Sequence, residues 1–397
     1  MRTAFILFIL ISILSGACIS EKTNREDNKI VIGTIDSLYS KILNEQRKIW
    51  IYVPEADNTF ARKTYPVVYL LDGDAHFYTV MSIIQQLSSV NMNMVLPQMI
   101  LVGIQNTNRT RDLTPSRDTL EDPSSGGSEN FTAFLEKELF PFVDSKYSTA
   151  PYRVIIGHSY GGLFCVNTLI NHPKLFNSYL AIDPSMNWDN RKLLKQAKEV
   201  LAQKNYEGSS FFLSIANQGY SDTDTSKDNA AAFELAKYLD SNAQNNLRYR
   251  WHYYKDDNHG SVPLISEYDG LRFMLDYYNP RISYRDFRNP AYNVDSFITV
   301  HYARVSSLMG YRVPPPESLL NWLGYLFIME KQYNKAHDLL KKNVENFPES
   351  YNAFDSMGEI LIFMGDTAAA VQNFEKSLDL NPRNENARNM IRKYKKQ

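Results

Sequence analysis

Short apolar runs alternate with helix-like stretches over most of the chain, from Ile30 to about Pro280. The runs are rich in Val, Ile, Leu and aromatic residues and predict strands, and apolar residues recur at helical spacing between most of them, as in 130–142, 163–171 and 230–239. This alternation predicts an α/β domain at 30–280, with a mostly parallel sheet covered by helices on both faces. The expected strands are 48–53, 67–71, 99–103, 153–156, 178–182, 210–215 and 248–254.

The C-terminal pattern is different and repeats itself. A connector at 281–316 ends in three consecutive prolines, which mark a boundary. After it, residues 317–350 align without gaps with 351–384, a period of 34 residues. Period and pattern resemble tetratricopeptide repeats, which are paired antiparallel helices, and 385–396 would be a capping helix. Matching positions are Gly324 with Gly358, Ala336 with Ala370, Leu340 with Phe374, and Pro348 with Pro382, while Asn343 stands where a small residue is usual.

Two repeats are fewer than the three or more that make a stable free array. We therefore expect the small all-α region at 317–397 to pack on the preceding domain. Its role is either structural, as a cap or a homodimer contact, or recognition of a protein partner.

The first residues have the pattern of an export signal. Arg2 precedes an apolar stretch at 4–14 that is well short of the ~20 residues a membrane span needs. Small residues then precede Cys18, as in a bacterial lipoprotein signal, whose cysteine becomes the lipidated first residue. We expect a signal peptide at 1–17 and a tether at 18–29. The protein would be an outer-membrane or cell-surface lipoprotein anchored through Cys18, or else a soluble periplasmic or secreted protein.

Composition narrows the classes of function. The chain has 397 residues, enough for two domains, and 44% hydrophobic residues, which is typical of globular proteins. Lys and Arg number 43 and Asp and Glu 44, a balance that argues against a nucleic-acid binder. Seven histidines and two cysteines leave little for a metal site. If Cys18 is lipidated, Cys165 is left alone in an apolar run and reads as a core thiol.

The strongest chemical motif is Gly157-His-Ser159-Tyr160-Gly161, between the strand at 153–156 and the helix at 163–171. In a strand–turn–helix context, G-x-S-x-G holds a serine in a strained turn with its hydroxyl projecting above the sheet. The new helix directs its first amides at the site, so the N–H of Tyr160 is an expected oxyanion donor. Ser159 is thus the predicted nucleophile.

A serine nucleophile needs a base, and His259 is the best placed histidine. It lies in the polar loop after the last strand, and downstream of Ser159 as the Ser–acid–His order requires. His172 ends a predicted helix and His252 lies within a strand, so neither fits as well.

The sequence leaves open which carboxylate orients His259. The loop after the strand at 210–215 has no carboxylate directly at the strand end. Asp222 is the first candidate, and Asp183, after the strand at 178–182, is the topologically permitted alternative. Asp224, Asp228 or a Ser–His dyad without an acid complete the possibilities.

Two further positions complete the expected site. The turn after the strand at 67–71 would supply the second oxyanion donor, from the backbone N–H of Gly73 or Asp74. Trp188, after the strand at 178–182, is expected either to line the acyl pocket or to pack as an ordinary core tryptophan.

These segments together resemble the esterase D-type putative esterase family, over roughly residues 30–280. The resemblance rests on Leu71-Asp-Gly-Asp74, Val102-Gly-Ile104, Arg109-Thr-Arg-Asp112, the Phe134–Pro141 segment, Gly157–Gly162, Asp183-Pro-Ser-Met-Asn-Trp188 and His259-Gly-Ser261. That family includes ferric-siderophore trilactone esterases, feruloyl esterases and S-formylglutathione hydrolases. It implies an α/β-hydrolase fold and serine ester hydrolysis without metal or organic cofactor. Many members carry an acid near the positions of Gln218 or Gly219, where this chain has none.

The sequence therefore predicts a serine-dependent carboxylic-ester hydrolase that acts outside the cytoplasm. Its substrate would be a small or polysaccharide-linked ester of the siderophore, feruloyl or acetyl class. The rival hypothesis is a surface binding protein, in which a decayed hydrolase domain displays the repeats to a partner. The intact Ser–His pair argues against this rival, and the missing acid at the end of the strand at 210–215 argues for it.

Overall fold

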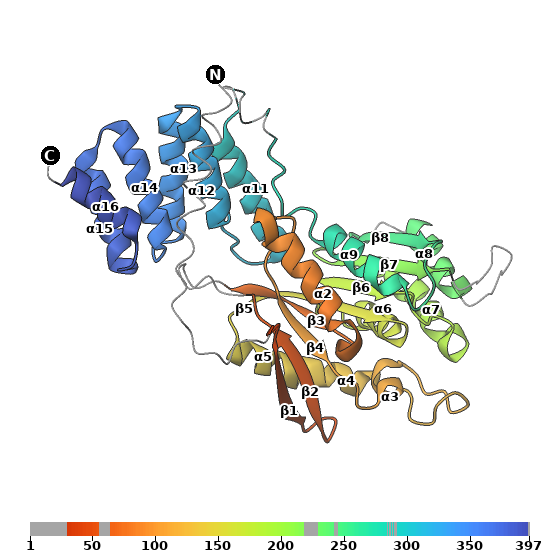
Figure 1. Cartoon of the computed structure of the whole chain (residues 1–397). Helices are drawn as coiled ribbons and strands as arrows, with labels where there is room; N and C mark the ends of the chain where they lie inside the picture. Colours follow the sequence, from red (N-terminus) through yellow and green to blue (C-terminus); the bar gives the residue numbers. More distant parts are fainter. Residues whose placement is uncertain are drawn as a thin grey trace. The chain divides into compact units, whose positions relative to one another are not determined.

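One eight-stranded sheet organises the first part of the chain in the computed structural model (Figure 1). The structure describes residues 30–54, 64–217, 229–241, 245–283, 285, 287, 289 and 292–395. The strand order is β1-β2-β4-β3-β5-β6-β7-β8. The strands are β1 (Thr34–Ser40), β2 (Glu45–Tyr52), β3 (Tyr65–Leu70), β4 (Ile100–Ile104), β5 (Thr149–His158), β6 (Ser178–Ile182), β7 (Ser210–Ala216) and β8 (Arg248–Tyr254).

The sheet is mixed, because its first two strands run against the others. β1 pairs with β2 and β2 with β4 in antiparallel fashion, whereas all pairs from β4 through β8 are parallel. All seven expected strands are present within a few residues of their predicted bounds, and β1 is an additional edge strand. Every residue of β3, β4, β6 and β7 is buried, as expected for strands covered on both faces.

Helices cover both faces of this sheet. α2 (Gly73–Ser88) and α9 (Val262–Met274) contact each other and the sheet, and α6 (Tyr160–Asn171) contacts β5, β6 and α7 (Trp188–Leu201). α7 in turn contacts α8 (Ala230–Ser241), which follows β7. Shorter elements complete this region: η1 (Val90–Met92), α3 (Arg109–Leu113), α4 (Ser128–Phe134), η2 (Leu135–Leu139) and α5 (Phe140–Lys146).

The C-terminal helices form two pairs that follow the 34-residue repeat. α12 (Glu317–Met329) packs with α13 (Tyr333–Asn346), and α14 (Tyr351–Met364) with α15 (Thr367–Leu380), before α16 (Glu385–Tyr394) ends the chain (Figure 1). Gly324 of α12 faces Leu340, and Gly358 of α14 faces Phe374, so the matched glycines allow the same close approach in both pairs. An all-helical region at the predicted place is therefore present, and its tetratricopeptide identity stays a prediction.

Asn343 departs from the repeat pattern, and Ser377 is the matching residue of the second repeat. Each of the two side chains donates a hydrogen bond to the partner helix of its own pair. Its side-chain amide donates to the backbone carbonyl of Glu317 at 3.4 Å, and the hydroxyl of Ser377 donates to that of Tyr351 at 2.8 Å. Both carbonyls belong to the first residue of the partner helix. Each buried polar group thus links the two helices of its own pair.

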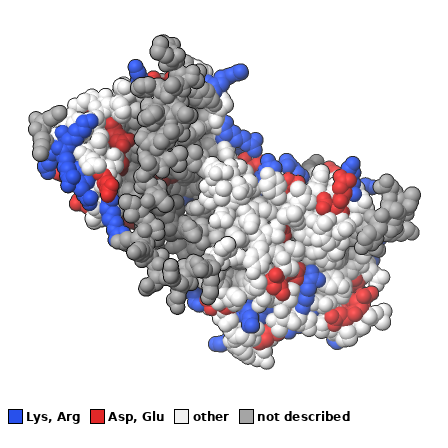
Figure 2. Space-filling view, in the orientation of Figure 1, with Lys and Arg blue, Asp and Glu red and all other residues white. Residues whose placement is uncertain are grey.

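α11 (Val294–Met309) contacts both the sheet region and the repeats. His301 contacts the backbone carbonyl of Tyr278, shortly after α9, at 3.0 Å. On its other side, Asp295 forms an ion pair with Lys342 of α13. Cationic and anionic side chains are interspersed over the described part of the face in Figure 2, in keeping with the near-balanced charge.

Candidate active site

Ser159 occupies a sharp turn between β5 and α6, as the motif predicts. Its backbone has φ 61° and ψ −116°, a conformation that costs a non-glycine residue about 1–3 kcal/mol. The N–H of Ser159 donates to the carbonyl of Ile182, at the end of neighbouring β6, at 2.9 Å. A side chain at Gly157 would come within 2.3 Å of the carbonyl oxygen of Gly161, so only glycine fits there. The strain is thus maintained by contacts on both sides of the serine.

His259 and Asp183 lie in hydrogen-bond contact. The Nδ1 atom of His259 is 2.6 Å from Oδ2 of Asp183, whose side chain is 1% exposed. The other carboxylate oxygen of Asp183 accepts the backbone N–H of Ala216, at the end of β7, at 2.9 Å. This carboxylate therefore has a defined position, and its bond to Nδ1 leaves Nε2 of His259 as the nitrogen that can accept a proton.

The other acid candidates from the sequence fall outside the described residues. Asp222, the first candidate from sequence, lies outside the described residues, and so do Asp224 and Asp228. Asp183 follows β6, which pairs with β5, so the two strand ends bring it close to the turn that carries Ser159.

The hydroxyl of Ser159 contacts Ser185 in this structure. The two Oγ atoms are 3.2 Å apart, and the N–H of Ser185 donates to the backbone carbonyl of Ser159 at 3.2 Å. Within the described residues, the hydroxyl of Ser159 makes this hydrogen bond rather than one to His259. Catalytic hydrogen bonds often form only when substrate is bound. Ser185 was not predicted; its signal in the sequence is its position two residues after Asp183.

The expected second oxyanion loop lies at the start of α2. Asp72 has a left-handed backbone, with φ 51°, and precedes Gly73, the first residue of the helix. A side chain at Gly73 would come within 2.4 Å of the backbone of Gly103, so the glycine is required for close packing on β4. The first N–H groups of a helix lack partners within it, so those of Gly73 and Asp74 are suited to donate hydrogen bonds to an oxygen that develops negative charge.

Arg109 links this loop to the turn that carries Ser159. Its guanidinium donates two hydrogen bonds to Asp72, at 2.6 and 2.9 Å, and a third to the carbonyl of His158 at 3.1 Å. It also lies over the ring of Tyr160, 5.3 Å from the ring centroid. Although burial opposes ionisation, the hydrogen bonds and charge of Arg109 hold the pKa of Asp72 below its ordinary value. One cation therefore connects the two loops expected to form the oxyanion hole.

A row of titratable groups lies behind His259. The ring centroid of His158 is 4.4 Å from that of His259 and 5.8 Å from that of His76, whose Nδ1 is 3.3 Å from a carboxylate oxygen of buried Glu267. Burial, with the positive charges of His259 and His76, lowers the pKa of His158 to about 4, and burial raises that of Glu267 to about 8. Both groups are therefore neutral near pH 7. Nothing in the sequence identified Glu267, which reads as an ordinary helix acid.

Trp188 lies beside the turn that carries Ser159, at the start of α7. Its ring is edge-on to that of Tyr160, with centroids 5.3 Å apart, and its indole N–H donates to the carbonyl of Ser116 at 3.0 Å. Trp188 is 7% exposed, so it packs in the core while bordering the expected site. Its role in binding an acyl group stays a prediction.

Of the two cysteines, only Cys165 lies within the described residues. Cys165 is a buried free thiol in α6, and burial raises the pKa of this thiol. Cys18 lies outside the described residues. Within the described ranges, His, Cys, Asp and Glu do not gather in a group that could hold a metal ion. Among the helices that the structure describes, none combines the length and apolarity needed to cross a membrane.

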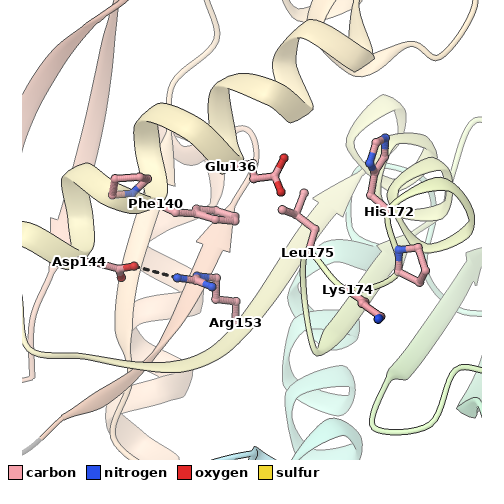
Figure 3. Close-up of a pocket in the computed structure, with 9 residues that line it drawn as sticks. Glu136, Phe140, Asp144, Arg153, His172, Lys174 and Leu175 are labelled. Carbon is pink, nitrogen blue, oxygen red and sulfur yellow. Dashed lines mark hydrogen bonds and ion pairs between the residues drawn. The ribbon is translucent and has the colours of Figure 1, made fainter.

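A pocket of about 480 Å³ lies beside β5 and the segment that follows α6 (Figure 3). Arg153, in the middle of that strand, lines it together with Glu136, Asp144 and Lys174. At about 3.3 Å per residue along a strand, Arg153 is roughly 20 Å from Ser159. This pocket is therefore separate from the candidate active site.

The sheet order, with Ser159 in the turn after β5 and His259 after β8, defines a hydrolase-like α/β protein. The chain belongs to the putative esterase family, whose model matches residues 40–262.

Relatives and solved structures agree with this assignment. The ferri-bacillibactin esterase BesA of Bacillus subtilis is 29% identical over 259 residues, which cover 60% of this chain and 89% of that protein. The siderophore enterobactin esterase of Emericella nidulans is 31% identical over 159 residues, which cover 35% of this chain and about half (52%) of the relative. The IroE-like serine hydrolase of Shewanella oneidensis matches in structure with a TM-score of 0.67 and 30% identity, over 79% of this chain and 99% of that one.

Proposed function

We propose that this esterase-family chain is a serine-dependent carboxylic-ester hydrolase, in which Ser159 is the nucleophile, His259 the base and Asp183 the orienting acid. The observation that carries the proposal is the 2.6 Å contact between His259 and the buried carboxylate of Asp183, at the sheet edge that also carries Ser159. Asp183 is the acid that a decayed hydrolase would lack. Its contact with His259 therefore argues against the rival binding-protein hypothesis.

The arrangement supports a two-step acyl transfer. Nε2 of His259 takes the hydroxyl proton of Ser159 as its oxygen attacks the ester carbonyl. The backbone N–H of Tyr160 and that of Gly73 or Asp74 then stabilise the negative charge on the carbonyl oxygen. His259 returns the proton to the departing alcohol, and the acyl group stays bound to the oxygen of Ser159. A water molecule, deprotonated by the same imidazole, then attacks the acyl carbon. The carboxylic acid leaves as His259 returns that proton to the oxygen of Ser159.

The proposed substrate is a siderophore ester. This rests on the two curated relatives described above, which are named for ferri-bacillibactin and enterobactin. The feruloyl and acetyl esters considered from sequence are the competing substrate classes.

A comparison of three substrates tests both parts of the proposal. Purified protein should hydrolyse the siderophore enterobactin with a higher kcat/KM than methyl ferulate or an acetylated sugar, and Ser159→Ala should abolish all three activities. A preference for one of the other esters would overturn the substrate class alone. If Ser159→Ala retained more than about a tenth of the rate, the assignment of the nucleophile would be wrong, because loss of a triad member costs several orders of magnitude.

We also propose that the protein is exported and anchored through a lipid on Cys18. The support is the N-terminal pattern in the sequence, since Cys18 lies outside the described residues. Labelling cells with a palmitate analogue should mark the wild-type protein and not Cys18→Ser. An unlabelled wild type would instead favour a soluble periplasmic or secreted enzyme.

A further inference from the structure

His259 is held by a hydrogen bond at one atom and by a ring on one face. It lies in the loop between β8 and α9, and its side chain is 44% exposed. Asp183 fixes Nδ1, but a ring fixed at a single atom can still rotate about that contact. The ring of His158 lies against it, with centroids 4.4 Å apart and planes 42° apart. The second contact therefore restricts the rotation that the first permits.

We propose that His158 is a positioning residue, whose ring holds the His259 imidazole in the orientation that directs Nε2 toward Ser159. His158 directly precedes Ser159, and its carbonyl accepts a hydrogen bond from Arg109 at 3.1 Å. The nucleophile and the ring that supports its base are thus neighbours in one rigid turn. The kinetic consequence of this inference rests on the proposed function, whereas its structural consequence does not.

Residues of α2 and α9 lie on the side of His158 that faces away from His259. The ring of His76, from α2, meets that of His158 edge-on, with centroids 5.8 Å and planes 78° apart. Glu267, from α9, is 1% exposed and lies 3.3 Å from Nδ1 of His76. The charges that face His76 are those of Asp72, Asp74 and Arg109. His158 is uncharged near neutral pH, so its ring can stay beside the imidazolium that His259 becomes during the reaction without charge repulsion.

Three variants test whether the ring itself matters. His158→Ala removes the ring, and His158→Phe keeps a ring without titratable nitrogens. His252→Ala, which replaces a histidine of β8, is the control.

Two measurements are needed. The first is steady-state ester hydrolysis. The second is NMR of ¹⁵N-histidine-labelled protein, in which the proton shared by His259 and Asp183 reports whether the His259 ring is ordered. We expect His158→Ala to broaden or lose that proton resonance and to lower kcat about tenfold to a hundredfold with little change in KM. His158→Phe should retain the resonance and recover most of the rate, and His252→Ala should match the wild type.

Two results would overturn the inference. One is a His158→Ala protein with an unchanged resonance and unchanged kcat. The other is a His158→Phe protein as impaired as His158→Ala, which would assign the role to the nitrogens and not to ring packing.

If His158→Ala does not fold, His158→Gln, which fills the space without a ring, takes its place. If the wild type hydrolyses no ester, the proposed function fails, while the resonance still decides how His259 is held.

Discussion

At His259, the proposed catalytic base, one hydrogen bond determines which ring nitrogen can accept a proton. Asp183 contacts Nδ1 of His259, so its replacement by an amide would favour the wrong tautomer and remove the negative charge that stabilises the imidazolium. Asp183→Asn should lower kcat by about 10²- to 10⁴-fold in an ester-hydrolysis assay. Asp256→Asn, an exposed neighbour of His259 in the same loop, is the matched control and should leave kcat within about twofold, as surface changes usually do. Equal losses in both variants would remove Asp183 from the mechanism.

Glu267 gives the protein a stability that depends on pH. Burial raises its pKa from 4.5 to about 8, so the folded chain keeps this proton between those values while the unfolded chain releases it. Its contribution to the free energy of unfolding is therefore complete below about pH 4.5 and declines as pH rises toward 8.

Glu267→Gln removes this titration while keeping nearly the same shape. We expect the variant to be more stable than the wild type at pH 8, by an amount on the order of a few kcal/mol, and the difference to shrink toward pH 5. Unfolding curves of both proteins at the two pH values provide the measurement. A difference that does not change with pH would mean that Glu267 is not held protonated.

At the scale of elements, the repeat pairs depend on small residues between their helices. Ala370 of α15 is 0% exposed, whereas Ala368, two residues earlier on the same helix, is exposed. Ala370→Val should overpack the pair and cost about 1–3 kcal/mol of stability. Ala368→Val should change stability by less than about 0.5 kcal/mol. Chemical unfolding compares the two, and equal effects would contradict the role of position 370 in bringing the helices together.

Local patterns predicted the elements well. β3, β4, β6 and β7 were recognisable because both their faces are buried, which requires a continuous apolar run. The helix pairs were recognisable because the 34-residue period can be read from the sequence without knowledge of the fold. β1 was missed because it lies at the sheet edge, where Ile35 and Tyr39 are exposed and no continuous apolar run is required.

Contacts between distant segments could not be predicted in the same way. The turn around Ser159 is specified within five residues, but Asp183 and His259 are 76 positions apart. Which carboxylate reaches the histidine depends on strand order, since β6 lies beside β5. The packing of His158 on His259, and the burial of Glu267, likewise follow only once three elements are placed together.

At the scale of the whole molecule, α11 connects the sheet region to the repeats. It contacts Tyr278 through His301 and pairs with Lys342 of α13 through Asp295. Truncation after Val313 would remove α13 and expose the face of α11 that it covers. We expect a lower unfolding temperature or a changed oligomeric state, with Ser159 still reactive toward a fluorophosphonate. A truncated protein that is equally stable but unreactive would show that the repeats contribute to the active site.

The central claim is that Ser159 is an activated nucleophile, and the site of fluorophosphonate attachment tests it most directly. After labelling of the full-length protein, peptide mass spectrometry should locate a single adduct on Ser159. Labelling should be absent in Ser159→Ala and strongly slowed in His259→Ala, because only a serine with a working base reacts at a useful rate. A folded wild-type protein that acquires no adduct, or acquires it on another residue while Ser159→Ala still hydrolyses ester, would contradict the account.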